Sequence, residues 1–375
     1  MNNKYSKILS PFTFPVSGVT IDSRVVLAPM TTFSGNADGT VSDSEIAYYK
    51  ERNKGADLLL TACAYVLPQG KGFHGQIGVH SDEMIPSLKR ISTTLKENGG
   101  KALLQIHHGG RMCPPEELPD GQSVSASAVA ALRDGAQIPR EMSVAEIEEA
   151  IAAYGEAARR AVEAGFDGVE IHGANTYLIQ QFFSPHSNRR TDKWGGSLEK
   201  RMAFPLAVVD AVKTAVAKST TRPFIIGYRI SPEEMENPGI TFQDTLALVE
   251  ALAAKGLDYL HVSTMSFWAG SMRDEKDKES RTKLIYEKVG HKLPIIGVGS
   301  ISSPEQAEEV LATGVSLVAL GRELLIEPHW LEKVKADKAE QIEKALDVHN
   351  QEGLKIPTPM WTSLLSRTGW LPIKE

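Results

Sequence analysis

Three polar side chains lie within six positions of one another near the middle of the chain: His172, Asn175 and Tyr177. They follow a short apolar run, residues 168–171, which is bounded by glycine and is typical of a buried β-strand. An imidazole, an amide and a phenol at a strand end can hydrogen-bond a substrate oxygen and supply a proton. The same residues could also be partly buried groups that the backbone satisfies, because polar clusters at strand ends are common.

Composition excludes several classes of protein. The chain has 375 residues, and 41 basic against 47 acidic side chains give a net charge of −6, which disfavours a nucleic-acid binder. No apolar run is long enough for a membrane helix or a signal peptide, so a cytoplasmic protein that binds no membrane is expected. The two cysteines, Cys63 and Cys113, are too few for a disulfide framework or a Cys-rich metal site, and we expect no metal.

Eight short apolar runs, each followed by a helical segment, indicate a parallel sheet with crossover helices. The expected strands are residues 24–28, 57–62, 102–106, 168–171, 223–229, 258–262, 293–298 and 316–320. The expected helices are residues 42–52, 81–98, 143–164, a segment starting near 197, 241–255, 281–289, 304–312 and 322–335. Eight such units close a (β/α)8 TIM barrel. The alternative, a doubly wound open sheet, lacks the glycine-rich first turn that it would need.

The barrel core should span about residues 24–336 of a single domain, 1–375. A hairpin over residues 12–21 is expected to plug the bottom of the barrel. A C-terminal helical extension, about 337–375, should begin with an amphipathic helix at 338–350. Its tail contains Trp361, Arg367 and Trp370, and large aromatic surface favours burial. The tail could cover the bottom of its own barrel, or it could reach a second subunit of a homodimer or larger assembly, with Arg367 near the partner's pocket.

The active site of such a barrel lies at the carboxyl ends of its strands. Gly299 and Gly321 follow the seventh and eighth strands, and Arg322 opens a helix, which is the arrangement of a barrel phosphate site. The two glycines could instead be tight-turn residues only. Gln105 and Arg229, on the third and fifth strands, need a polar partner if they are buried. Flavin mononucleotide (FMN) offers an amide-like edge, a site for negative charge and a phosphate.

Several motifs carry a resemblance to a known family. They are LAPMT at 27–31, LLQIHHGGR at 103–111, the stretch AGFDGVEIHGANTYLIQQFFSPHSNRRTDKWGGSLEKR at 164–201, GYRISP at 227–232, GVGSI at 297–301 and LGRELLIEP at 320–328. With these motifs the chain resembles the Old Yellow Enzyme family of FMN-dependent NADH:flavin oxidoreductases and ene-reductases. The resemblance implies bound FMN, NADH or NADPH as reductant, and reduction of the activated C=C bond of α,β-unsaturated carbonyl compounds.

The resemblance also implies a role for each candidate. The cofactor-binding residues would be Pro29, Met30, Thr31, Cys63, Gln105, Arg229, Gly299, Gly321 and Arg322. Within that set Thr31 would lie against a flavin carbonyl, Cys63 beside the isoalloxazine ring as a small buried residue, and Gln105 at the pyrimidine edge. Arg229 would stabilise negative charge at N1, and the last three residues would hold the phosphate.

For the substrate, His172 and Asn175 would hydrogen-bond the carbonyl oxygen, and Tyr177 would supply a proton. Phe267, on a charged loop at 264–281, is expected to contact the substrate, and that loop is either a mobile lid or a solvated surface loop. The choice between NADH and NADPH stays open, as does the role of His107. Two other functions stay open as well: an FMN-dependent dehydrogenase or oxidase of another barrel type, and a flavin-binding redox protein without a dedicated substrate.

Overall fold

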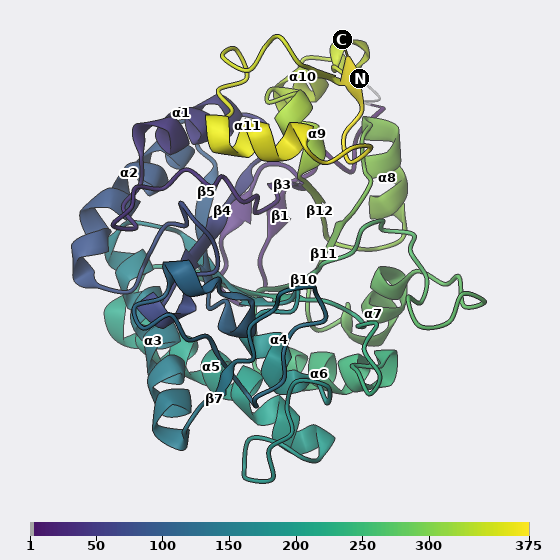
Figure 1. Cartoon of the computed structure of the whole chain (residues 1–375). Coiled ribbons are helices and arrows are strands. Elements are labelled where there is room, and N and C mark those ends of the chain that lie inside the picture. Colours follow the sequence, from purple (N-terminus) through teal and green to yellow (C-terminus); the bar gives the residue numbers. More distant parts are fainter. Residues whose placement is uncertain (1–3, 375) are drawn as a thin grey trace.

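The predicted barrel is present in the computed structural model, which describes residues 4–374 (Figure 1). Neighbouring strands are parallel throughout the closed barrel, and the register of one strand pair shifts between Leu60 and Cys63. In chain order its strands are β3 (Val25–Leu27), β4 (Leu58–Tyr65), β5 (Lys101–His107), β8 (Gly168–Gly173), β9 (Ile225–Ile230), β10 (Tyr259–Val262), β11 (Ile295–Val298) and β12 (Leu317–Leu320). The predicted (β/α)8 fold is therefore confirmed.

Helices surround the barrel as the sequence pattern predicts. They are α1 (Asp43–Arg52), α2 (Ile85–Lys96), α3 (Val144–Glu163), α5 (Leu198–Ser219), α6 (Phe242–Ala254), α7 (Arg281–Val289) and α8 (Pro304–Ala312). Ser143 and Glu146 form the expected capping box at the start of α3. The single helix expected at 322–335 is divided into α9 (Arg322–Ile326) and α10 (Trp330–Lys335). Pro328 lies between them, and a proline has no N–H with which to continue a helix.

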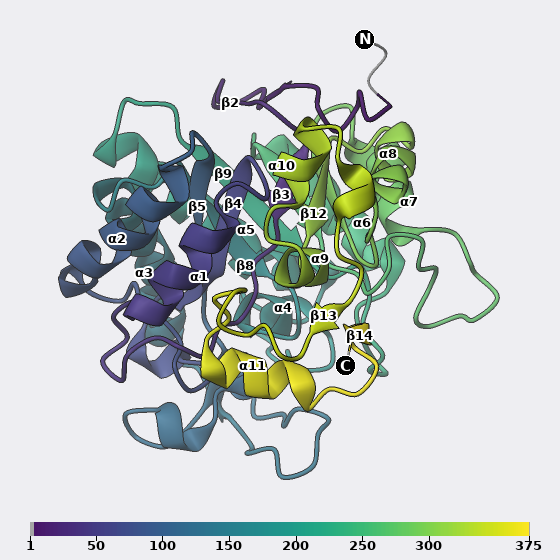
Figure 2. The same ribbon diagram turned by 90° about the horizontal axis from the view of Figure 1, so that it is seen from above.

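A small hairpin closes the end of the barrel opposite the strand carboxyl ends. It consists of β1 (Phe12–Thr13) and β2 (Thr20–Ile21), which pair antiparallel as expected. Phe14 from its turn is fully buried among the inward-facing apolar residues of the strands, 6.0 Å from the ring of Tyr259. Figure 2 shows the hairpin and the C-terminal helix at opposite ends of the molecule.

The C-terminal extension differs from the prediction. The helix expected at 338–350 is wrong, because only a short 3-10 turn (Ala339–Gln341) forms there and β13 (Leu346–Asp347) follows. β13 pairs with β14 (Ile373–Lys374) at the end of the chain, so tertiary pairing overrides local helix propensity. The tail contains one α-helix, α11 (Thr358–Leu365). A further short helix, α4 (Leu178–Phe183), which is not among the predicted helices, directly follows Tyr177.

One more pair of short strands, β6 (Val124–Ser125) and β7 (Arg140–Glu141), lies in the long connection between β5 and α3. Within residues 4–374, no helix is both long and apolar enough to cross a lipid bilayer.

Candidate active site

A small cavity at the carboxyl ends of the strands brings the predicted chemical residues together. Its volume is about 100 Å³. The residues that line it are Pro29, Met30, Thr31, Cys63, Gln105, His172, Asn175, Tyr177 and Arg229. They come from the ends of β3, β4, β5, β8 and β9 and from the loops that follow. Parallel strands deliver their carboxyl ends to one face of a barrel, which is why residues so far apart in sequence meet there.

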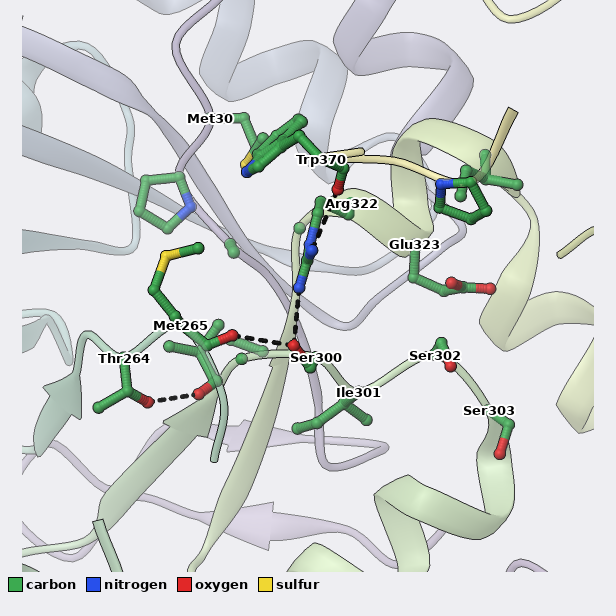
Figure 3. A pocket seen from close by; sticks show the side chains of 18 of the residues that line it. Met30, Thr264, Met265, Ser300, Ile301, Ser302, Ser303, Arg322, Glu323 and Trp370 are labelled. Carbon is green, nitrogen blue, oxygen red and sulfur yellow. Dashed lines mark hydrogen bonds between the residues drawn. The ribbon is translucent and has the colours of Figure 1, made fainter. Parts of the chain in front are cut away.

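A larger cavity of about 550 Å³ adjoins the first and shares Pro29, Met30 and Arg229 with it. The predicted phosphate-binding residues Gly299, Gly321 and Arg322 line this larger cavity and not the smaller one, and Figure 3 shows Arg322 there. Together the two cavities run from His172, Asn175 and Tyr177 to Arg322 at the start of α9.

Glycine is required at position 299. Its φ is +119°, and a Cβ there would lie 2.7 Å from the carbonyl oxygen of Thr264. The backbone after β11 can therefore approach a ligand closely. Arg322 donates from Nη2 to Oγ of Ser300 over 2.9 Å, which fixes the guanidinium beside this glycine loop. Main-chain N–H groups, a hydroxyl and a guanidinium suit a phosphate.

The C-terminal tail contributes a wall of the larger cavity that sequence reasoning missed. Trp370, Pro372 and Lys344 line it, together with Glu323 from α9. In Figure 3 Trp370 lies next to Arg322, whose guanidinium carbon is 5.8 Å from the centroid of the Trp370 ring. The tail was expected at the barrel bottom or on a neighbour, and instead it covers the open end of its own barrel. No local pattern indicates this contact, because Trp370 is 48 residues away in sequence from Arg322, which it meets in the cavity wall.

Three aromatic rings meet edge to face in the small cavity. The ring centroids of His107 and Tyr177 are 4.2 Å apart, those of His172 and Tyr177 are 5.1 Å apart, and those of the two histidines are 5.3 Å apart. Nδ1 of His107 lies 3.0 Å from Nε2 of Gln76, which fixes that ring from behind. His107 thus supports the other two rings.

The electrostatics of this cluster favour neutral hydrogen-bond donors. Burial, reinforced by the positive charge of Arg229, lowers the pKa of His172 to about 3. Its Nδ1 accepts the N–H of Ala174 over 3.3 Å, so the proton of the neutral ring is on Nε2. Burial raises the pKa of Tyr177 above its ordinary value, so the phenol keeps its proton at neutral pH.

Asn175 is oriented by its surroundings. Its backbone has φ +57°, and its N–H donates to Oγ of Ser231 over 2.9 Å. Its Oδ1 accepts from the hydroxyl of Ser263 over 3.0 Å, which leaves Nδ2 free to donate to a ligand. Ser263 in turn accepts from Nη2 of Arg229 over 3.2 Å. Ser263 was not among the predicted site residues, although it follows the sixth strand directly.

Gln105 and Arg229 have unsatisfied polar atoms that a ligand could meet. Arg229 is buried, and its Nε has no hydrogen-bond partner among the described residues. Gln105 donates from Nε2 to Glu170 over 2.6 Å, and its Oε1 is left for the cavity. An acceptor beside a buried cation fits the amide-like, negatively polarised edge of a flavin.

Cys63 has the properties of a packing residue. It is buried, and burial raises the pKa of its thiol to about 12. A thiol with so high a pKa is not a nucleophile at neutral pH. Its place in the cavity wall agrees with the small buried residue expected beside a flavin ring.

Phe267 does not line either cavity, contrary to expectation. Its side chain is 1% exposed and packs over β11, where a Cβ on Gly297 would lie 2.7 Å from its ring. An apolar side chain is stabilised by that burial and is not available at the mouth. Thr264 and Met265 of the same loop line the larger cavity instead.

Residues 7–341 match the family model of the NADH:flavin oxidoreductase / NADH oxidase family. The chain belongs to this family. The predicted Old Yellow Enzyme resemblance is thereby confirmed, and the residues around the two cavities fit its cofactor. The protein is a flavin oxidoreductase that binds FMN and uses a reduced nicotinamide.

Relatives within this family agree with that assignment. The probable NADH-dependent flavin oxidoreductase YqiG of Bacillus subtilis is 48% identical over 375 residues, which is all of both chains. NADH:acrylate oxidoreductase of Vibrio harveyi is 48% identical over 349 residues, covering 92% of this chain and 34% of its own length. The structure of morphinone reductase with tetrahydroNAD matches with a TM-score of 0.74 at 26% identity, covering 88% of this chain and 91% of the other.

Proposed function

We propose that this flavin oxidoreductase is an ene-reductase, which reduces the activated C=C bond of α,β-unsaturated carbonyl compounds with NADH or NADPH. The observation that carries the proposal is the convergence of two neutral donors and one protonated phenol on one cavity. Bound FMN would supply the hydride-transfer chemistry between the nicotinamide and the substrate. The rest of the reaction depends on side chains of this chain.

His172 and Asn175 hold the substrate carbonyl. Nε2–H of His172 and Nδ2–H of Asn175 are the atoms that their other hydrogen bonds leave unused. Two donors aimed at one oxygen draw electron density from the conjugated double bond and stabilise the negative charge that develops on that oxygen. One such donor contributes roughly 3 kcal/mol to the transition state.

Tyr177 is the proposed proton donor to the α-carbon. Its hydroxyl proton is retained at neutral pH, and the rings of His107 and His172 fix the position of the phenol. A general acid must be held within hydrogen-bond reach of the atom that it protonates. The same packing also limits the access of water to the phenol.

The names of relatives support this substrate class. Acrylate, the substrate in the name of the Vibrio harveyi relative, has a C=C bond conjugated to a carboxyl group. That relative is about three times as long as this chain, so its whole activity is not carried over. The alternative is a dehydrogenase that oxidises a hydroxy acid and uses a histidine as the base for the hydroxyl proton. It is disfavoured because a His172 with a pKa of about 3 is a weak base.

The tail and the barrel together form the proposed FMN-binding unit. Arg367, considered above for a neighbouring pocket, lies 5.5 Å from the ring of Trp370 in its own chain. That contact and the position of Trp370 in the cavity wall support a role for the tail within one chain. A shared site in a homodimer is the alternative that truncation would reveal.

The deciding experiment is anaerobic turnover of the FMN-loaded protein. NADH and NADPH are each mixed with an enone such as 2-cyclohexenone, and the saturated product is measured by mass spectrometry. A 2-hydroxy acid serves as the comparison. Saturated product with the enone alone supports the proposal. Oxidation of the hydroxy acid, or reduction of the flavin without any turnover of enones, would contradict it.

A further inference from the structure

Glu170 is a fully buried carboxylate that has no part in the chemistry described so far. It lies in the middle of β8, with 0% of its side chain exposed, and it does not line either cavity. In the barrel register it is level with Gln105 on β5 and with Gly227 on β9. It therefore lies beside Gln105, the residue of β5 that lines the small cavity.

Three donors converge on this carboxylate. Oε1 accepts from Nε2 of Gln105 over 2.6 Å, and Oε2 accepts from the hydroxyl of Tyr259 and from Nδ1 of His261, each over 2.9 Å. Burial alone would raise the pKa of Glu170, yet interaction with His261 and the charge of Arg229 hold it below the ordinary value. The group is an ionised carboxylate inside the barrel, and such a group must be well compensated.

The chain makes room for this arrangement on the intervening strand. Tyr259 on β10 has to cross β9 to reach Glu170 on β8. At the crossing point β9 carries Gly227, where a Cβ would lie 2.0 Å from the tyrosine ring. A side chain at position 227 would therefore push Tyr259 away from the carboxylate, so the network depends on the glycine.

The carboxylate fixes the orientation of the Gln105 amide. An amide can normally present either its oxygen or its nitrogen to a given partner. An ionised carboxylate only accepts, so Nε2 of Gln105 has to face Glu170. Oε1 of Gln105 and its second amide N–H are then the atoms that face the cavity and are available to a ligand. Glu170 also places a negative charge near the cation of Arg229, on the adjacent strand.

We propose that Glu170 is a positioning residue that sets the reduction potential of the bound FMN, by locking the Gln105 amide and by offsetting the positive charge of Arg229. A reduced flavin carries more negative charge than an oxidised one. Arg229 stabilises that charge, and a buried carboxylate behind it opposes it, because charges interact over longer distances in a low-dielectric interior. Glu170 thus keeps the flavin more strongly reducing than Arg229 alone would leave it.

The test compares three variants of the FMN-loaded protein by their midpoint potentials, measured by spectral titration with a reference dye. Glu170→Gln removes the negative charge and gives the side chain a donor as well as an acceptor. The midpoint potential of this variant should rise by at least about 30 mV, which is a tenfold increase in the equilibrium ratio of reduced to oxidised FMN. Tyr259→Phe removes one donor and leaves the carboxylate less compensated, so its potential should fall. Glu234→Gln is the matched control, because Glu234 is also buried and hydrogen-bonded, by Gln180 and the N–H of Ile240, but neither of these partners lines a cavity, whereas Gln105 does.

Opposite shifts for the two network variants, with no shift for the control, are the expected result. A purely structural role would weaken FMN binding or lower the unfolding temperature without giving the shifts opposite signs. Unchanged potentials, or shifts of the same sign, would overturn the proposal. If Glu170→Gln does not fold, an unchanged potential in Tyr259→Phe is sufficient to overturn it. No substrate is used, so the outcome is independent of whether the protein reduces enones.

Discussion

Arg322 donates from Nη1 to the main-chain carbonyl oxygen of Trp370 over 3.1 Å. The first residue of α9 thereby holds the returning tail against the end of the cavity that suits a phosphate. Pairing of β13 with β14 fixes the same segment from its other side. The tail thus forms part of the wall of the larger cavity, and this relationship leads to the first prediction.

Trp370→Ala should weaken FMN binding roughly fivefold, as expected for the loss of about 1 kcal/mol of aromatic contact. The measurement is fluorescence titration of the apoprotein with FMN. Thr368→Ala is the control, because Thr368 is exposed and does not line the cavity. Equal affinities for the Trp370 variant and the wild type would show that the ring does not contact the cofactor.

Deletion of residues 358–375 separates the two possible roles of the tail. A wall within one chain predicts a weaker FMN complex and an unchanged number of subunits in solution. A shared site predicts a change to a smaller assembly together with a raised KM for the enone. Light scattering and steady-state kinetics on the same sample distinguish the two outcomes.

His172→Ala should slow reoxidation of the reduced enzyme by an enone about 100-fold, the usual cost of losing one donor to a developing oxyanion. FMN should remain bound, since the cavity of the phosphate site is untouched. Stopped-flow absorbance of the flavin measures the rate. His186→Ala, in the loop after α4 and outside both cavities, should keep the wild-type rate. Reoxidation of His172→Ala at the wild-type rate would refute the assignment of the carbonyl-binding pair.

Tyr177→Phe keeps the ring packing and removes only the hydroxyl proton. Reduction of the flavin by the nicotinamide should be little changed, whereas enone reduction should slow about 100-fold, within the range for loss of a general acid. Because burial raises the pKa of Tyr177, the wild-type rate should show no loss from phenol ionisation between pH 7 and 9. A decline that is present in the wild type and absent from Tyr177→Phe would contradict this.

Glu323 makes FMN affinity depend on pH. Burial and the nearby charge of Glu327 raise the pKa of Glu323 to about 8, so this cavity residue is neutral below that pH and anionic above it. A carboxylate formed there repels a phosphate, and the affinity for FMN should fall as the pH rises through about 8. Glu323→Gln should remove that fall. Riboflavin, which has no phosphate, should bind with little pH dependence, and a similar fall for riboflavin would rule out this explanation.

The barrel and most of the site could be predicted because both depend on local signals. Each strand–helix unit is visible as an apolar run and an amphipathic segment, and the carboxyl ends of parallel strands meet whatever the details of packing. His172, Gln105 and Arg229 therefore converge as expected. Phe267 could not be placed in this way, because whether an aromatic residue in a loop turns inward or toward the mouth depends on a space such as that over Gly297.

The contribution of the tail was beyond sequence reasoning for a different reason. Trp370 reaches the cavity through pairing between β13 and β14, and neither segment has a strand pattern of its own. The stretch at 338–350 has good helix formers, and a distant pairing partner decides its structure. Glu170 did leave a signal, because an acidic residue in the middle of a buried strand is anomalous unless something compensates it.

The hairpin that carries Phe14 affects how the two substrates reach the active site. Phe14 fills the amino-terminal end of the barrel, and the two cavities described above lie at the strand carboxyl ends, so we expect reductant and oxidant to enter at the same end and to bind one after the other. An excess of either reactant would then inhibit binding of the other. Initial rates plotted in double-reciprocal form should give parallel lines, with mutual inhibition at high concentrations. The hairpin would then influence the order of substrate binding from the end of the barrel opposite the active site.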